Sequence, residues 1–318
     1  MIFGRAPDGR EVRAFDLRDD GISARVIEWG AVLQDLRVDG VDRSLVLSFS
    51  DLDGYLGDTE HIGAVVGRVA NRLSGGRFSV EGREHRATRN IGGRDTLHGG
   101  ARGWGRRCWT MLDATSKRVV FRLRDPDGAE GFPGAVDAQV VYAVRPHALE
   151  VSIFATARAA TVLNPTHHHY FNLSGERSID AHELELNAGR FTALDARLMP
   201  TGELANAVGE TDWRRARRIG AARLDLNYCL ADQGRAAPER AATLSGGGVA
   251  MTVLTTAPGL QVYSGDNLPP GGRFSPRAGM CLEPQFWPDA PNNPGFPSIE
   301  IAAGARLQQT TRFVFAKA

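Results

Sequence analysis

Four short segments combine ionisable or amide side chains with glycine or aromatic neighbours, and such segments are candidates for a polar site. They lie at 67–76 (GRVANRLSGG), 95–100 (DTLHGG), 164–175 (NPTHHHYFNLSG) and 279–292 (GMCLEPQFWPDAPN). In the first segment, arginine and asparagine offer the donors and acceptors that sugar hydroxyls need. In the second, two glycines are expected to leave open space beside the ring of His98. Taken alone, the first segment fits an ordinary surface turn better than a site, and the second fits either interpretation.

A lone glutamate, Glu283, stands in an otherwise apolar and aromatic stretch of the fourth segment. Its neighbours include Leu282, Phe286 and Trp287. Burial beside aromatic rings raises the pKa of a carboxyl group and makes the carboxylate a usable base near neutral pH. The pattern therefore favours a buried, reactive carboxylate over an exposed glutamate at the end of a strand.

Three consecutive histidines occupy 167–169 in a predicted strand. Because side chains alternate across a strand, His167 and His169 face one side and His168 faces the other. His167 and His169 could bind a metal ion, or a single histidine could face a cavity and transfer protons. A surface run without function is the third interpretation. A metal site needs a further ligand with supporting hydrogen bonds, and the chain has eight histidines but no HExxH motif.

Period-2 alternation of apolar residues dominates the chain between these segments, which is the pattern of half-buried strands. The alternation predicts strands at 78–80, 119–123, 136–144, 149–155 and 310–315. Asp39-Gly40 and Glu81-Gly82 have the composition of hairpin turns. These strands would supply the framework that positions the four polar segments.

Helical patterns are weak, and the two short helices they indicate fall at about 202–207 and 237–244. No repeat of fixed period and no shift in composition divides the chain. Clustered glycines fit repeated tight turns, because glycine reaches positive φ without a Cβ clash. The sequence therefore predicts one all-β domain over 1–318, of the sandwich or barrel class.

The overall composition argues against several kinds of partner. Lys plus Arg number 38 and Asp plus Glu number 37, and no basic stripe suggests nucleic-acid binding. No stretch approaches the ~18 apolar residues of a membrane helix, and charges interrupt the N-terminus, unlike a signal peptide. The three scattered cysteines, Cys108, Cys229 and Cys281, fit reduced thiols and a cytoplasmic location.

Taken together, the four segments resemble the aldose 1-epimerase family, also called galactose mutarotases. The motifs GRVANR, TLHGG, HHYFNLSG and CLEPQ followed by PDAPN occur in the family's order, and the match runs along almost the whole chain. The resemblance implies a large antiparallel β-sandwich with an open sugar-binding cleft. It also implies an isomerase that interconverts the α and β anomers of a free aldose without a metal or other cofactor.

The resemblance assigns roles to seven positions of this chain. The general base would be Glu283, the general acid His168, and a second active-site histidine, bonding the sugar near its ring oxygen, would be His98. Contacts to sugar hydroxyls and part of the cleft lining would come from Asn71, Arg72, Asp225 and Gln261.

The chain departs from the family's pattern at some of the neighbouring positions. The family usually has Asn and Ser or Thr beside the catalytic histidine, where this chain has His167 and His169. Leu226 stands where a histidine is usual, and Pro284 follows the glutamate where Thr is common. These changes keep the acid, the base and the second histidine, so they bear on the sugar preference rather than on the chemistry.

Three other functions are compatible with parts of the pattern. A glycoside hydrolase would use Asp225 and Glu283 as paired carboxylates, which leaves the two histidine segments without a task. A hexose-6-phosphate mutarotase would need cations aimed at the phosphate, for which Arg68, Arg94 and Arg102 are available. A non-catalytic sugar-binding protein on the same fold would lack the acid or the base.

Overall fold

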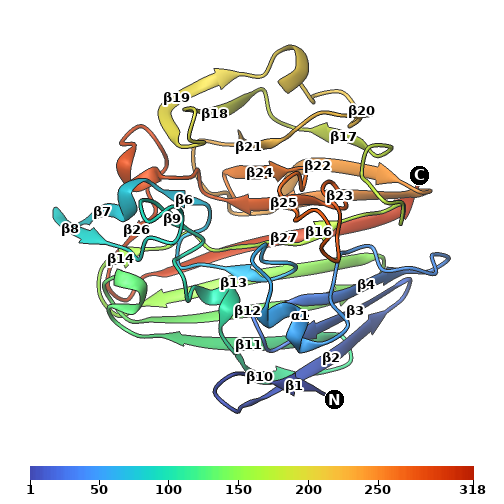
Figure 1. Ribbon diagram of the computed structural model, residues 1–318, viewed down its shortest axis with the longest axis horizontal. Helices are drawn as coiled ribbons and strands as arrows, with labels where there is room; N and C mark the ends of the chain where they lie inside the picture. The colour runs from blue at the N-terminus through green and yellow to red at the C-terminus, as the bar shows by residue number, and fades with distance from the viewer.

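The computed structural model describes all of residues 1–318 and consists mainly of antiparallel β-strands (Figure 1). The largest sheet has nine strands. Their spatial order is β10 (Thr110–Ala114), β11 (Arg118–Asp125), β12 (Val136–Arg145), β13 (Ala148–Ala157), β27 (Arg306–Lys317), β23 (Val249–Thr255), β22 (Glu239–Gly246), β17 (Glu183–Leu186) and β20 (Arg217–Arg218). The strands predicted at 119–123, 136–144, 149–155 and 310–315 are confirmed as parts of β11, β12, β13 and β27.

Two further sheets lie against this one. A six-stranded sheet has the order β16 (Tyr170–Phe171), β25 (Met280–Gln285), β24 (Gly259–Tyr263), β21 (Asp225–Cys229), β18 (Arg190–Leu194) and β19 (Pro200–Asn206). A four-stranded sheet consists of β1 (Ile2–Arg5), β2 (Glu11–Asp19), β3 (Ile22–Ile27) and β4 (Leu33–Val38). The six-stranded sheet supplies most of the strands that position the site.

Short strand pairs and turns complete the fold. The pairs are β14 (Thr161–Val162) with β26 (Glu300–Ile301), β15 (Thr166–His167) with β5 (Val65–Val66), β6 (Arg72–Leu73) with β9 (Thr96–Leu97), and β7 (Arg77–Val80) with β8 (Arg83–Arg86). The helices are α1 (Leu52–Leu56) and five short 3₁₀ turns, Ser74–Gly76, Trp104–Arg106, Ala129–Gly131, Gly209–Thr211 and Ala290–Asn292. None of these helices has the length and hydrophobicity to cross a membrane.

The main core lies between the nine-stranded sheet and the two smaller sheets. The inward residues of β12, among them Val140 and Tyr142, join Leu260 and Leu282 of the six-stranded sheet and Val26 of the four-stranded sheet in one cluster of 49 buried residues. Burying a side chain of this size contributes about 1.5–3 kcal/mol. The alternation along β12 is therefore explained, because one face of the strand fills the space between the layers. This arrangement is the predicted β-sandwich.

The prediction of two short helices at about 202–207 and 237–244 is wrong, because strands β19 and β22 occupy these positions. In β22, the register against β23 shifts between Arg240 and Ala242. Ala241 and Ala242 are consequently both buried, which breaks the alternation that would have indicated a strand. In β19, pairing with β18 at the edge of the sheet overrides the helix preference of its Glu-Leu-Ala sequence.

The two predicted hairpin turns differ in outcome. Glu81 and Gly82 both have positive φ and join β7 to β8, as a tight hairpin requires. Asp39 and Gly40 also form a turn, in which the Val41 amide donates to the Val38 carbonyl. However, β4 is the edge strand of its sheet and no further strand follows in that sheet, so this turn is not a hairpin.

Candidate active site

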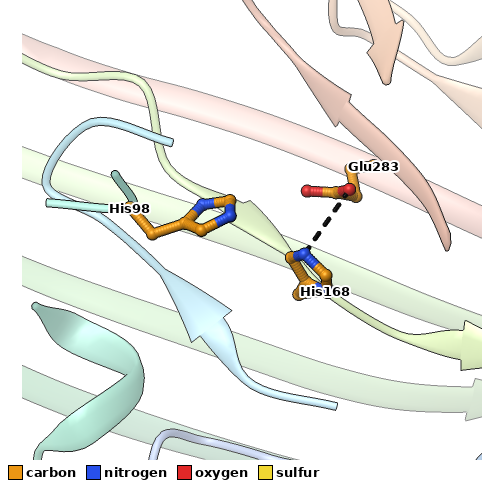
Figure 2. A group of neighbouring side chains, drawn as sticks. All are labelled: His98, His168 and Glu283. Carbon is orange, nitrogen blue, oxygen red and sulfur yellow. Dashed lines mark ion pairs between the residues drawn. The ribbon is translucent and has the colours of Figure 1, made fainter. Parts of the chain in front are cut away.

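Strand register brings His168 and Glu283 together, although 115 positions separate them in the chain. Strand β16 pairs antiparallel with β25, and Tyr170 lies opposite Cys281. His168 lies two residues before Tyr170 and Glu283 two residues after Cys281, so this antiparallel pairing brings the two side chains to the same place. The His168 Nε2 atom lies 3.7 Å from the Glu283 Oε1 atom (Figure 2). This separation exceeds a hydrogen bond, so both groups remain available to a ligand.

His98 approaches this pair from a different part of the fold (Figure 2). It follows strand β9, which pairs with β6 so that Leu97 lies opposite Arg72. The His98 amide donates to the Asn71 carbonyl at 3.0 Å, and the Asn71 amide donates to His98 Nδ1 at 3.2 Å. Because Nδ1 accepts a hydrogen bond, the proton of the neutral ring is on Nε2. The same pair of short strands therefore positions His98, Asn71 and Arg72 together.

Gly99, the residue after His98, allows a close backbone contact and is not explained by open space beside the His98 ring. A Cβ atom at Gly99 would lie 2.0 Å from the carbonyl oxygen of Gly67, and Gly99 has a φ of +82°. Only glycine permits this close approach of two backbones. The glycine therefore fixes the loop that carries His98 against the segment that leads to Asn71, instead of leaving space beside the ring.

Asp225 and Gln261 lie on the strands next to Glu283. Gln261 is opposite Glu283 in the β24–β25 pair, and Asp225 is opposite Tyr263 in the β21–β24 pair. Gln261 Nε2 donates to Asp225 Oδ1 at 2.6 Å, and Arg72 Nη2 lies 3.6 Å from Asp225 Oδ2. These contacts fix the Asp225 carboxylate at the side of the site where β6 meets the six-stranded sheet.

All seven residues selected from the sequence line one cavity, which encloses about 500 Å³ including its open mouth. Seven further residues also line it, namely Thr59, Glu60, His61, Leu97, Tyr170, Tyr263 and Asn267. The sequence analysis missed them. Alternation from Gln261 along β24 would have found Tyr263. No pattern in the sequence marks His61 as a site residue. It lies in the irregular loop before β5, and only the three-dimensional path of that loop brings its side chain to the cavity.

Burial governs the ionisation of the central groups. It raises the pKa of Glu283 well above its usual value, and the nearby Asp225 adds to this effect while Arg72 opposes it. Burial lowers the pKa of His168 to about 4, and it lowers that of His98 well below its usual value, helped by His61 and His168. Perturbed carboxyl and imidazole groups that share a cavity are typical of acid–base sites.

His167 and His169 face away from the cavity, as the alternation predicted. Their rings stack with centroids 4.5 Å apart, and both lie against Phe313 in the core. The structure brings no third ligand to them, so the interpretation as a metal site has no support. They are buried, so the surface-run interpretation is wrong. The three groups that could hold an ion are instead His98, His168 and Glu283, whose ligand atoms lie within 4.8 Å of one another.

Acid is expected to destabilise the fold through His167 and His169. Burial lowers the pKa of His167 to about 3 and that of His169 well below its usual value. Below pH ~6.5 the unfolded chain takes up protons that the folded chain excludes, so the free energy of unfolding falls by about 1.4 kcal/mol per pH unit for each histidine. The variant H167N/H169S removes both groups. From pH 6.5 to 5, the wild type should lose about 3 kcal/mol more than this variant in urea unfolding. If the free energy of unfolding fell equally in the wild type and the variant, His167 and His169 would not be the source of the acid sensitivity.

The three arginines considered as phosphate ligands do not line the cavity. Arg68 is buried in an ion pair with Asp125 at 2.9 Å, and its Nη1 donates to two backbone carbonyls. Arg94 is exposed beside Asp95, and Arg102 lines a different cleft. Arg72 is the cavity's one lysine or arginine, and it lies against Asp225. The cavity therefore offers a phosphate group little attraction.

Comparison with known proteins decides the family. The model of the aldose 1-epimerase family matches residues 13–314. The chain belongs to this family. Galactose mutarotase from Bos taurus is 36% identical over 339 residues, which cover 100% of this chain and 98% of that protein. The aldose 1-epimerase of Escherichia coli (strain K12) is 31% identical over 336 residues, with 98% and 97% covered.

Solved structures of aldose epimerases share the fold. The aldose epimerase homologue from C. elegans superposes with a TM-score of 0.90 at 26% identity, covering 96% of this chain and 99% of that one. The galactose 1-epimerase from Lactobacillus acidophilus gives a TM-score of 0.88 at 25% identity, covering 100% and 98%. The resemblance and the β-sandwich predicted from the sequence are thereby confirmed.

Proposed function

We propose that this chain is an aldose 1-epimerase that interconverts the α and β anomers of a free aldose by opening and reclosing the sugar ring. The observation that carries the proposal is the 3.7 Å separation of His168 Nε2 and Glu283 Oε1 inside a polar cavity. The two oxygens that exchange protons in this reaction, the anomeric hydroxyl and the ring oxygen, are bonded to the same carbon. An acid and a base that act on both must therefore lie close together, as these two groups do.

In the proposed mechanism, the pair carries one proton throughout. Glu283 begins as a carboxylate and His168 as an imidazolium. Glu283 removes the proton of the C1 hydroxyl while His168 protonates the ring oxygen, and the bond between C1 and that oxygen breaks. The open aldehyde rotates about C1–C2 and presents its other face. Reclosure reverses both proton transfers, so the pair returns to its starting state.

The environment of the pair decides which of these two proton arrangements is favoured. Burial disfavours both charges, so the empty cavity favours the neutral form with the proton on Glu283. Hydrogen bonds from sugar hydroxyls to a carboxylate favour its ionised form, as does the positive charge of Arg72. A bound sugar therefore moves the pair toward the charged arrangement that the reaction needs.

The remaining residues would hold the sugar. With its proton on Nε2, neutral His98 can donate a hydrogen bond near the ring oxygen. Asn71, Arg72, Asp225 and Gln261 offer amide, guanidinium and carboxylate groups to the other hydroxyls. Holding the ring in one orientation converts a loose encounter into a positioned reaction.

The alternatives fit the cavity less well. A hexose-6-phosphate would need free cations, whereas the cavity's single arginine lies against Asp225. A hydrolase using Asp225 as its second carboxylate would have to free it from the hydrogen bond with Gln261. A purely binding protein would have no need for His168 beside Glu283.

Polarimetry tests the proposal on the wild-type protein. Freshly dissolved α-galactose, α-glucose and several pentoses should reach anomeric equilibrium faster with the protein than in buffer, and at least one free sugar should be preferred over its 6-phosphate. The rate should be the same after dialysis against EDTA, because the proposed proton transfers need no metal ion. Equilibration no faster than in buffer for every free sugar would overturn the proposal.

A further inference from the structure

A second cleft, rich in arginine, is lined by residues of strand β10 and of the turn between β1 and β2. These elements lie at one end of the molecule (Figure 1). It encloses about 1540 Å³, part of it open to solvent. Its walls come from the β1–β2 turn, the segment 102–108 and strands β10 and β11. Six of its lining residues are arginines, namely Arg10, Arg102, Arg106, Arg107, Arg122 and Arg124.

Only half of these arginines have a carboxylate partner. Asp8, Asp125 and Asp137 pair with Arg10, Arg107 and Arg122, respectively. No carboxylate lies within 4.0 Å of the other three, which are Arg102, Arg106 and Arg124. Six guanidinium groups and three partner carboxylates leave a charge of +3 at the cleft, whereas the whole chain carries only +1. Positive charge is therefore concentrated here, and a concave surface strengthens its field.

An aromatic ring lies beside these arginines. Trp29 lines the cleft and is half-buried, whereas the other four tryptophans are fully buried. Guanidinium groups match the geometry of phosphate oxygens, and an accessible indole face can stack on a flat ring. We propose that this cleft binds a phosphate-bearing small molecule, held by Arg102 and Arg124, with Trp29 available to the base of a nucleotide.

The cleft also contacts the loop behind the sugar cavity. Arg106 Nη2 donates to the Asp58 carbonyl at 3.2 Å. The Asp58 carboxylate in turn accepts from the Glu60 and Ile62 amides at 2.8 and 2.6 Å. These bonds hold the loop of His61, whose ring centroid lies 4.9 Å from that of His98. A small cavity between the two sites is lined by Trp29, Arg106 and His61. An anion in the cleft that draws the Arg106 guanidinium toward itself would break the hydrogen bond from Arg106 to the Asp58 carbonyl and so loosen the loop that carries His61.

Isothermal titration calorimetry with pyrophosphate tests the site independently of any activity. The wild type should bind pyrophosphate at one site, and the variant R102A/R124A should bind it at least about tenfold more weakly. The matched control is R177A/R215A, which removes two exposed arginines that form no ion pair, from the segments near β17 and β20. This control should bind like the wild type. Absent binding, or an equal loss in both variants, would overturn the proposal.

Two further measurements define the ligand and the coupling. ATP should bind more tightly than pyrophosphate in the wild type but not in W29L; equal affinities in the wild type would overturn the role of Trp29. The coupling rests on the proposed function. Saturating pyrophosphate should change the mutarotation rate of the wild type and not that of R102A/R124A. Simple competition with sugar would place the anion in the sugar cavity and contradict the second site.

Discussion

Replacing Glu283 with glutamine is expected to lower kcat for mutarotation by about 10²–10⁴-fold, the usual contribution of a positioned acid–base group. Glutamine has nearly the same shape and keeps a hydrogen-bonding oxygen, but it cannot accept the proton of the C1 hydroxyl. The measurement is the change in optical rotation of fresh α-galactose, with the uncatalysed rate in buffer subtracted.

The fold should survive this change. Glu283 is 2% exposed, and burial penalises its charged form, so a neutral amide at the same place should leave the melting temperature unchanged or higher. The matched control is E203Q, at an exposed glutamate of β19 outside the cavity. It should keep the wild-type rate. Undiminished activity of E283Q would show that the base has been assigned wrongly.

Replacing His168 with asparagine should lower kcat much more than it changes KM. Asparagine can still hydrogen-bond a sugar, but it cannot protonate the ring oxygen as the bond to C1 breaks. Because His168 acts in the transition state and adds little to ground-state binding, the loss should appear in kcat, by about 10²–10⁴-fold.

The control for this variant is H85N, since His85 lies on β8 and does not line the cavity. It should behave like the wild type in both kinetic constants. If H168N raised KM as strongly as it lowered kcat, His168 would be a binding residue instead of an acid. Circular dichroism at the assay temperature excludes unfolding as the cause of either loss.

The alternation of residues such as Val140 and Tyr142 predicted five strands, which the structure contains in β7, β11, β12, β13 and β27, because a strand with one buried face alternates in this way. The sequence analysis did not predict the other strands, many of which are only two to six residues long. It failed where local pattern and fold disagree. The bulge at Arg240 and Ala242 hid strand β22, and pairing in the sheet outweighed the helix preference of β19. The single-domain organisation and the cytoplasmic location stay predictions.

The residues of the candidate site were predicted from their motifs. The structure shows how strand pairing brings together motifs that lie far apart in the sequence. Pairing of β16 with β25 brings His168 to Glu283, and pairing of β6 with β9 brings Asn71 and Arg72 to His98. His61 could not be predicted in the same way. It reaches the cavity from an irregular loop, and only the three-dimensional arrangement of that loop places its ring beside His98.

The central claim is that Glu283 and His168 act as one acid–base pair on a single sugar ring, and kinetics of the variant E283Q/H168N test it most directly. If the two groups act as a unit, losing either one removes most of the benefit of the other. The double variant should then have a kcat within a few-fold of the slower single variant. Losses that multiply, so that the double variant is slower by the product of the two single effects, would contradict the claim.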